Sequence, residues 1–367
     1  MSLNKPVVGI SEAISILFIY ISAKTFIFYG PPLIEAGMNA AWMIPLIQIA
    51  IGLGGVWLLA ALLAKSSGRD LVQIGEELTG PYINTLFSFY YLIVIIFVAA
   101  IALRGTSERV VAGFLPDTPI SLVVISFVMG SMIVSYLGLE AIVRTARFLV
   151  GILVLSMILL YVLTSPFWDL VSIYPLLGAG SHEIIKAALM NTGDFVEILL
   201  LGIIYPFIPQ DKVRAIGIWG VLIAGTFMFL IVLVTILVFT YPTASELTLP
   251  SFELARIINI GRFGQRMEVV FLPIWVFANL ILLSISFYAG AKILARMCKL
   301  KDYRPFVFSA TVLSVVAAFV TQNVAQLAQM DQYFSLCSFG ALIAILLTLY
   351  MAAWFKTKGG GQGEKGA

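Results

Sequence analysis

Apolar residues in this chain are gathered into long blocks, and short polar segments separate the blocks. Each block is close to the ~20 residues that an α-helix needs to cross the hydrocarbon layer of a membrane. The alternation of apolar and polar residues that marks a membrane β-strand is absent. Because a helix satisfies its own backbone hydrogen bonds in lipid, the blocks are predicted to be transmembrane helices. The ten predicted spans are residues 10–37, 41–64, 82–105, 119–138, 147–165, 188–209, 216–241, 267–297, 305–321 and 331–355.

The first and sixth spans contain residues that break a helix. In the first span, Lys24 is followed by Gly30-Pro31-Pro32, and two prolines remove two backbone donors and clash with the preceding turn. In the sixth span, the polar run Asn191-Thr192-Gly193-Asp194 is followed by Glu197 and, further on, by Pro206. Breaks at corresponding positions of two halves are typical of transporters built from inverted repeats. The pattern therefore predicts an all-α integral membrane fold of five plus five helices, with helices 1 and 6 broken.

The domain organisation follows from the same pattern. The connections between spans are too short to fold separately, so residues 1–355 are predicted to form a single transmembrane domain. The two repeats cover about residues 10–165 and 188–355. Residues 356–367 are rich in Gly and Lys and are predicted to be a disordered C-terminal tail.

The two breaks predict a binding site for a small molecule near the middle of the membrane. Unwound backbone at that depth is tolerated only where it lines a cavity or is buried in protein. Lys24, Asp194 and Glu197 are costly in hydrocarbon unless they are paired or hydrated, so Lys24 is expected to face one of the two carboxylates. Two interpretations stay open. In the first, Lys24 contacts a ligand or its side chain occupies a place where other transporters bind Na⁺. In the second, the charges form a structural pair that fastens the two broken helices. The predicted ligand-binding residues come from spans 1, 3, 6 and 8: Ser22, Lys24, Thr25, Phe26, Val98, Thr192, Gly193, Asp194, Glu197, Leu282 and Ser286.

Composition agrees with a membrane protein, and charge sets its orientation. Hydrophobic residues make up 61% of the chain and charged residues 11%, far from the balance of a soluble domain. If the N-terminus is cytoplasmic, most Lys and Arg residues fall in the inside connections, as the positive-inside rule requires. We therefore expect both termini in the cytoplasm. The same bias explains the net charge of +3, so no nucleic-acid partner is implied.

Motifs for catalysis or metal binding are missing from the sequence. There is no phosphate-binding loop, dinucleotide fingerprint, zinc-protease motif or nucleophile elbow. The chain has one histidine and two cysteines, Cys298 and Cys337, which give neither a disulfide framework nor metal-ligand spacing. We expect no enzyme activity, no catalytic residues, no metal and no cofactor.

Residues 249–305 carry a resemblance to a known family. They read LPSFELARIINIGRFGQRMEVV before the eighth span and end LKDYRP after it. This resembles the B-subunit family of spore germinant receptors, which shows a run similar to E-L-x-R-x-I-x-I-G-x-F-x-x-R-x-E/D at this place and the same LKDYRP. Phe195-Val196-Glu197 resembles the family's F-G-E run in the sixth span. The resemblance extends over nearly the whole chain and is most specific in 249–305.

The resemblance implies a fold, a role and partners. The family belongs to the amino acid/polyamine/organocation transporter superfamily, whose members have a LeuT-like fold of ten helices. Members are multi-pass proteins of the spore inner membrane that bind a nutrient germinant, often an amino acid. They work in the lipid bilayer with an A subunit and a lipoprotein C subunit, and the complex is thought to release ions when the germinant binds. The alternative reading is a proton- or sodium-coupled secondary amino acid transporter.

This sequence departs from the family at both breaks. Many members have a glycine-rich stretch in the first break, whereas this chain has Ser22-Ala23-Lys24-Thr25, and Val196 replaces the glycine of F-G-E. Glycine there exposes backbone to a ligand carboxylate. A lysine can instead pair with that carboxylate, fill the cavity or favour a different ligand, so the departure bears on which germinant is recognised.

Overall fold

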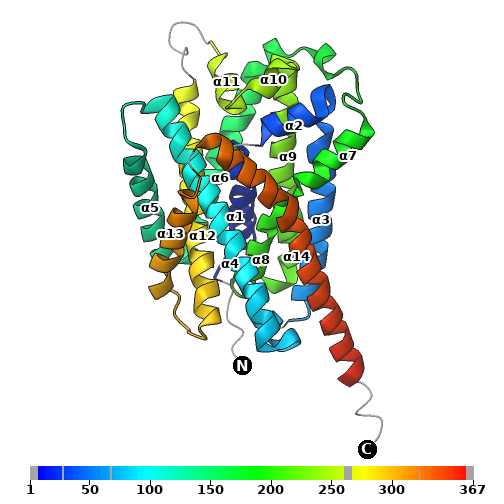
Figure 1. Ribbon diagram of the computed structural model, residues 1–367, viewed down its shortest axis with the longest axis vertical. Helices are drawn as coiled ribbons and strands as arrows, with labels where there is room; N and C mark the ends of the chain where they lie inside the picture. The colour runs from blue at the N-terminus through cyan, green and yellow to red at the C-terminus, as the bar shows by residue number, and fades with distance from the viewer. Residues whose placement is uncertain (1–6, 27–28, 67, 260–266, 322, 361–367) are drawn as a thin grey trace, which may run out of the picture.

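The computed structural model describes residues 7–26, 29–66, 68–259, 267–321 and 323–360, and all secondary structure in these ranges is helical (Figure 1). The α-helices and the 3₁₀ turns, labelled η, are α1 (Ile10–Ser22), η1 (Ala23–Phe26), α2 (Gly30–Gly37), η2 (Met38–Ala40), α3 (Met43–Leu63), α4 (Leu71–Phe114), α5 (Ile120–Leu137), α6 (Leu139–Thr164), η3 (Ser165–Phe167), η4 (Leu170–Ile173), α7 (Ser181–Met190), η5 (Thr192–Ile198), α8 (Leu199–Ile204), η6 (Tyr205–Phe207), η7 (Gln210–Lys212), α9 (Val213–Phe239), α10 (Thr243–Glu246), α11 (Pro250–Arg256), α12 (Glu268–Met297), α13 (Pro305–Ala318) and α14 (Val324–Gly360).

The predicted spans are present as helices. Within the described residues, eight helices are long and apolar enough to cross a membrane, and the bent pair α1 and α2 makes a ninth span. The remaining predicted span is α13, an apolar helix of 14 residues. At 1.5 Å per residue it is roughly 21 Å long, shorter than the hydrocarbon layer. It packs against α4, α5 and α12, so it completes the bundle. The protein is a multi-pass membrane protein.

Several helices are longer than the apolar blocks from which they were predicted. α4 begins at Leu71, where the predicted span begins at 82, because the amphipathic stretch before it joins the apolar helix across a kink at Gly80, whose φ is +79°. Asp70 starts the helix by accepting a hydrogen bond from the backbone N–H of Gln73. The sixth span begins at Ser181, and α14 continues to Gly360, into the segment predicted as a tail. Residues 361–367 lie outside the described residues.

Both predicted breaks are present. The first span ends its α-helix at Ser22, forms a 3₁₀ turn, and resumes as α2 at an angle of 64°. Pro31 and Pro32 stand in the first turn of α2, where the N–H groups that they lack have no partner inside the helix. In the sixth span, α7 ends at Met190, the chain runs through the 3₁₀ turn η5, and α8 follows.

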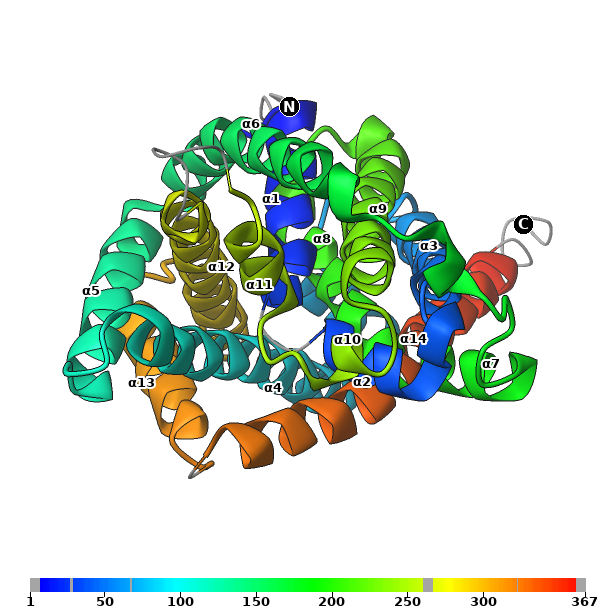
Figure 2. The same ribbon diagram turned by 90° about the horizontal axis from the view of Figure 1, so that it is seen from above.

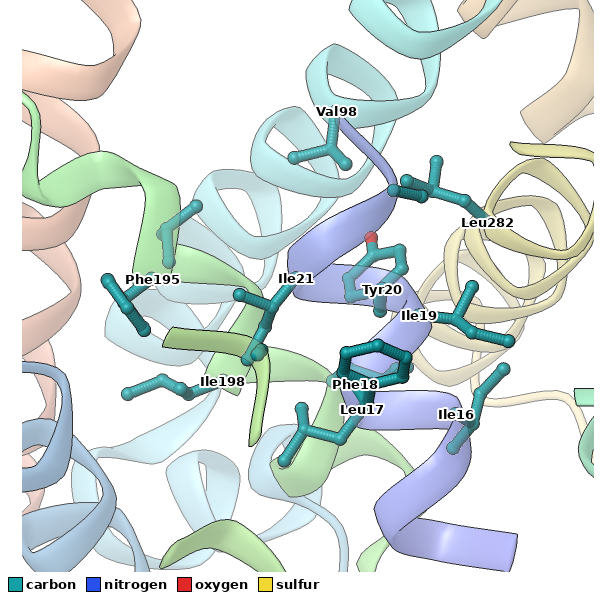
Figure 3. Close-up of a cluster of buried hydrophobic side chains, with 14 of the residues drawn as sticks. Ile16, Leu17, Phe18, Ile19, Tyr20, Ile21, Val98, Phe195, Ile198 and Leu282 are labelled. Atoms are coloured by element: carbon teal, nitrogen blue, oxygen red, sulfur yellow. The ribbon is translucent and has the colours of Figure 1, made fainter. Parts of the chain in front are cut away.

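The two broken spans lie inside the bundle. Seen from above, α1 and α8 are surrounded by α4, α6, α9 and α12 (Figure 2). Every residue from Ile16 to Ser22 is buried, and these side chains meet Val98 of α4, Phe195 and Ile198 of η5 and Leu282 of α12 (Figure 3). Gly220 lets α9 approach this core, because a Cβ there would lie 2.5 Å from the side chain of Leu17.

Contacts at one end of the bundle join the connections that the charge pattern places in the cytoplasm. The backbone N–H of Val8 donates to Phe207 O at 3.1 Å, so the start of α1 lies beside the end of the sixth span. Arg296 at the end of α12 pairs with Asp70 before α4, its Nε lying 2.8 Å from Oδ2. Lys356 of α14 lies 3.3 Å from the carboxylate of Glu77. These contacts gather the start of α1, the connections that follow α3, η6 and α12, and the end of α14 at one end of the bundle.

The alternation can be tested by labelling single cysteines. Exposed Asp117 and exposed Lys301 are separated by five spans, namely α5, α6, α7–α8, α9 and α12, so they must lie at opposite membrane surfaces. After both exposed cysteines, Cys298 and Cys337, are replaced by Ser, we expect an impermeant maleimide to label Asp117→Cys in intact cells. Lys301→Cys should be labelled only after permeabilisation. Labelling of both variants from one side would contradict this topology.

Candidate functional site

The two breaks are joined by a buried ion cluster. Lys24 of η1 places its Nζ 3.1 Å from Asp194 Oδ1 and 2.7 Å from Glu197 Oε1, and both carboxylates belong to η5. The side chains are 11%, 13% and 0% exposed, respectively. The predicted pairing of Lys24 with the sixth span is thus present, and it involves both carboxylates.

The local conformation of η5 explains how one lysine reaches two acids. In a 3₁₀ turn, side chains three residues apart eclipse one another on the same face. Asp194 and Glu197 have this spacing in η5, so their carboxylates lie side by side. In an α-helix the same two residues would be offset by about 60° around the axis. The 3₁₀ turn therefore presents a double acceptor to the facing break.

The electrostatics of the cluster are those of a desolvated ion pair. Moving a carboxylate or an ammonium out of water costs several kcal/mol for each ion unless the charges meet in good geometry. Lys24 is the only cation of the described residues within ion-pair distance of either carboxylate. The cluster carries one positive and two negative formal charges, so it retains an attraction for further positive charge.

A cavity of about 520 Å³ adjoins the cluster. This volume is within the roughly 300–1,000 Å³ typical of small-molecule sites. Its walls come from the first break, α2, α4, the second break and the beginning of α14, and α2 lies at the upper end of the bundle in Figure 1. The lining residues are Lys24, Tyr29, Pro32, Leu33, Glu35, Ala36, Ile101, Asn191, Asp194, Ala328, Gln329, Asp331, Gln332 and Ser335.

Of the predicted ligand-binding residues, Lys24 and Asp194 line this cavity and most of the others do not. Val98 and Leu282 point into the apolar core around α1 (Figure 3). Glu197 is buried behind Lys24. Thr25 is buried, and its hydroxyl has no hydrogen-bond partner among the described residues. The side chain of Phe26 lies outside the described residues.

Three predicted hydroxyl groups donate to the backbone carbonyl four residues earlier in the chain. Ser22 donates to Phe18 O at 2.7 Å, Thr192 to Ala188 O at 2.6 Å, and Ser286 to the carbonyl of Leu282 at 2.8 Å. A hydroxyl in a helix bonds readily to the carbonyl four residues earlier, which removes it from the set of free ligand donors. Apolar side chains and internal hydrogen bonds therefore fill the predicted midplane region, and the open space lies beside it.

Gly193, a residue of the second break, allows close packing between η5 and α14. A Cβ at this position would lie 2.2 Å from the Cα of Ser335 and 2.5 Å from its carbonyl oxygen. Glycine therefore lets η5 touch the backbone of α14 directly. This contact brings α14 to the wall of the cavity.

A hydrogen-bonded bridge missed by the sequence analysis also connects the two breaks. Tyr29 Oη donates to Gln48 Oε1 at 2.7 Å, and Gln48 Nε2 donates to the carbonyl oxygen of Asn191 at 2.8 Å. Gln48 is fully buried in α3 and reaches one break with each end of its amide. A polar residue inside an otherwise apolar span is the sequence signal that points to it.

Asp331 and Ser335 of α14 are two polar lining residues that were not among the predicted ligand-binding residues. They stand at the beginning of the last span, which has no helix breaker to draw attention to it. Among the described residues, no group of three or more His, Cys, Asp and Glu side chains is arranged to hold a metal ion.

Comparison with solved structures identifies the fold. The fold is similar to that of Mhp1, a nucleobase-cation-symport-1 family transporter solved with bromovinylhydantoin bound, with a TM-score of 0.63 and 16% identity over 94% of this chain and 80% of that one. It is also similar to MhsT solved with L-phenylalanine, with a TM-score of 0.63 and 14% identity over 90% and 88% of the two chains. The chain has the LeuT-like fold of these transporters.

Comparison with sequences gives the family. The family model described as "Spore germination protein" matches residues 8–327, so the chain belongs to this family. Spore germination protein KB of Bacillus subtilis is 25% identical over 284 residues, which cover 75% of this chain and 76% of that protein. Spore germination protein B2 of the same organism is 22% identical over 325 residues, which cover 88% and 87% of the two chains.

The stabilising role of the ion cluster can be tested by removing its cation. Lys24→Met keeps the length of the side chain but leaves two buried carboxylates without a counter-charge, and breaking a buried pair in this way costs about 3–5 kcal/mol. We expect a clear fall in the melting temperature of the purified protein. Adding Glu197→Gln should restore part of it, because one uncompensated charge disappears.

The matched control is Arg144→Met, which breaks the exposed pair with Glu140 on α6. The two side chains are 69% and 51% exposed, so solvent screens the pair and we expect a loss of at most ~1 kcal/mol. Equal melting temperatures for Lys24→Met and the native protein would refute the stabilising role of the cluster.

The contact between η5 and α14 can be tested with a single methyl group. Gly193→Ala places a Cβ against the backbone of Ser335, and such overpacking costs about 1–3 kcal/mol. We expect reduced thermal stability. In the control Gly54→Ala on α3, no atom lies within 4 Å of the new Cβ, and a helix gains up to ~1 kcal/mol from the exchange. Equal stability of the two variants would argue against a tight contact at Gly193.

Proposed function

We propose that this chain is the nutrient-sensing subunit of a spore germinant receptor and binds a small germinant, an amino acid in the first instance. The observation that supports this most directly is the cavity of about 520 Å³ against the two facing breaks, in a chain of the spore germination protein family. The role is that of a binding protein rather than an enzyme, and it involves no cofactor.

In this proposal the ligand acts through the breaks. It contacts Lys24 and Asp194, which belong to two different broken helices, and Gln48 ties the same two breaks together. A ligand shifts a conformational equilibrium only if it binds the two conformations with different affinity. A site shared by two hinged segments meets this condition, because any rotation of one segment against the other changes the distances between its walls.

The structure also suggests the side from which the germinant arrives. The cavity lies on the α2 side of the breaks, whereas the other end is closed by the pair Arg296–Asp70 and by the contact of Val8 with Phe207. With both termini in the cytoplasm, the cavity faces outward. We propose that the protein lies in the inner membrane of the spore and passes the signal to an A subunit and a lipoprotein C subunit, which lead to ion release.

The second candidate is a proton- or sodium-coupled amino acid transporter. The LeuT-like fold supports it, as does the position of Lys24, whose ammonium could take the place of a coupling cation. A transporter must open to each side in turn, so the contacts that close the Val8 end would have to break in every cycle.

Uptake and binding measured on one preparation separate the two functions. We expect the purified protein in liposomes to bind its germinant without accumulating it under a proton or sodium gradient, because a sensor needs the ligand only to shift its conformation. The measurement is equilibrium binding together with time-resolved uptake of labelled amino acids, with empty liposomes as the control. Concentrative uptake would favour the transporter and count against a role in sensing alone.

A further inference from the structure

The walls of the cavity carry an excess of negative charge. Among the described lining residues Lys24 is the only cation, whereas Glu35, Asp194 and Asp331 contribute carboxylates. Lys24 is already within ion-pair distance of Asp194 and of the fully buried Glu197. Its charge is therefore balanced inside the protein, and little of it is left to attract the carboxylate of a ligand.

The opposite charge that acts on Asp331 is Lys24, which is already paired with Asp194 and Glu197. No cation of the described residues lies within ion-pair distance of it, and its side chain is half-buried, so water screens it only in part. Glu35 differs because its side chain is exposed. Burying an unpaired carboxylate is costly, and a bound cation would relieve that cost.

A second observation on the same helix indicates a ligand. Ser335 is 7% exposed, and its hydroxyl has no hydrogen-bond partner among the residues that the structure describes. It lies four residues after Asp331, so both side chains stand on one face of α14 and line the same cavity. A buried hydroxyl without a partner loses its hydrogen bond to water without compensation unless something in the cavity accepts or donates one.

The size and the remaining walls favour an organic ligand over a bare ion. A cavity of about 520 Å³ is much larger than a single dehydrated cation, which needs several oxygen ligands at short distance. Pro32, Leu33, Ala36, Ile101 and Ala328 give the cavity an apolar lining beside its carboxylates. Such a site suits an aliphatic body that ends in an ammonium group.

We propose that the cavity binds an organic amine of net positive charge, with its ammonium group held by Asp331 and the hydroxyl of Ser335. This inference rests on the proposed function and narrows the germinant to cationic compounds, such as a basic amino acid or a diamine. Asp331 is then a determinant of ligand specificity, outside the set of residues at the breaks.

The test compares L-lysine with L-norleucine, which has a similar aliphatic side chain and lacks the terminal ammonium group. Dissociation constants are measured by calorimetry on the full-length protein in nanodiscs. We expect L-lysine to bind at least about tenfold more tightly, as is typical of a hydrogen-bonded ion pair. Asp331→Asn should bring the two constants within about threefold of each other by weakening L-lysine alone. The control Asp117→Asn, which removes an exposed carboxylate at the same end of the bundle, should change neither.

Ser335→Ala separates a ligand contact from a structural role. Because no described residue forms a hydrogen bond with this hydroxyl, its removal should leave the melting temperature of the ligand-free protein unchanged or raised. We expect the same variant to weaken L-lysine binding several-fold. A loss of stability with unchanged L-lysine affinity would overturn the assignment of Ser335.

Three results would overturn the proposal. They are equal affinity for L-lysine and L-norleucine, a preference for L-lysine that survives Asp331→Asn, and competition by KCl at millimolar concentration, which would indicate an inorganic cation site.

The proposed function is judged separately, by whether spores that carry the protein germinate in response to an amine that binds. Binding without germination would contradict the sensing role and leave the cation site standing. Germination by neutral amino acids alone, with no binding of amines, would support the sensing role and contradict the cation site.

Discussion

The contact of Lys24 with Asp194 and Glu197 is the interaction on which the rest of the structure depends. A single charge at this depth would be costly, and three charges together are tolerated because each faces an opposite one. The cost of separating them holds the two broken spans against each other, although neither span has a continuous helix at that point. The surrounding helices can therefore pack against the two broken spans as they would against two continuous helices.

The same contact defines where a ligand can bind. The ion cluster holds the two breaks together, but the chain there does not form a continuous helix. The cavity lies beside the cluster, between α2 and the beginning of α14. The close approach of Gly193 to Ser335 brings α14 to this wall, and Gln48 fixes the distance between the breaks. Residues of the same two breaks thus stabilise the bundle and line the cavity. For this reason a ligand bound in the cavity can influence how the whole bundle packs.

Much of the fold could be predicted from the chain alone. The spans follow from block hydrophobicity, and the breaks follow from Pro31-Pro32 and from the polar run 191–194, because these residues act locally on the backbone. The pairing of Lys24 with the sixth span was also predictable, since an ionised group in lipid must find a partner. The ends of α4 and α14 were less predictable, because an amphipathic turn and an apolar helix can join across one glycine, as they do at Gly80.

The order of the residues along the chain was enough to predict a membrane protein, the order of its spans and the two places where the helices break. Which residues face open space became known from the packed helices. Val98 and Leu282 have the depth expected of ligand contacts, yet they pack into the core around α1 (Figure 3), whereas Asp331 and Ser335 line the cavity from a span with no break. The reason is that hydrophobicity and helix breaking are properties of neighbouring residues. A cavity depends on how helices distant in the sequence are rotated against one another, and local sequence does not record that rotation.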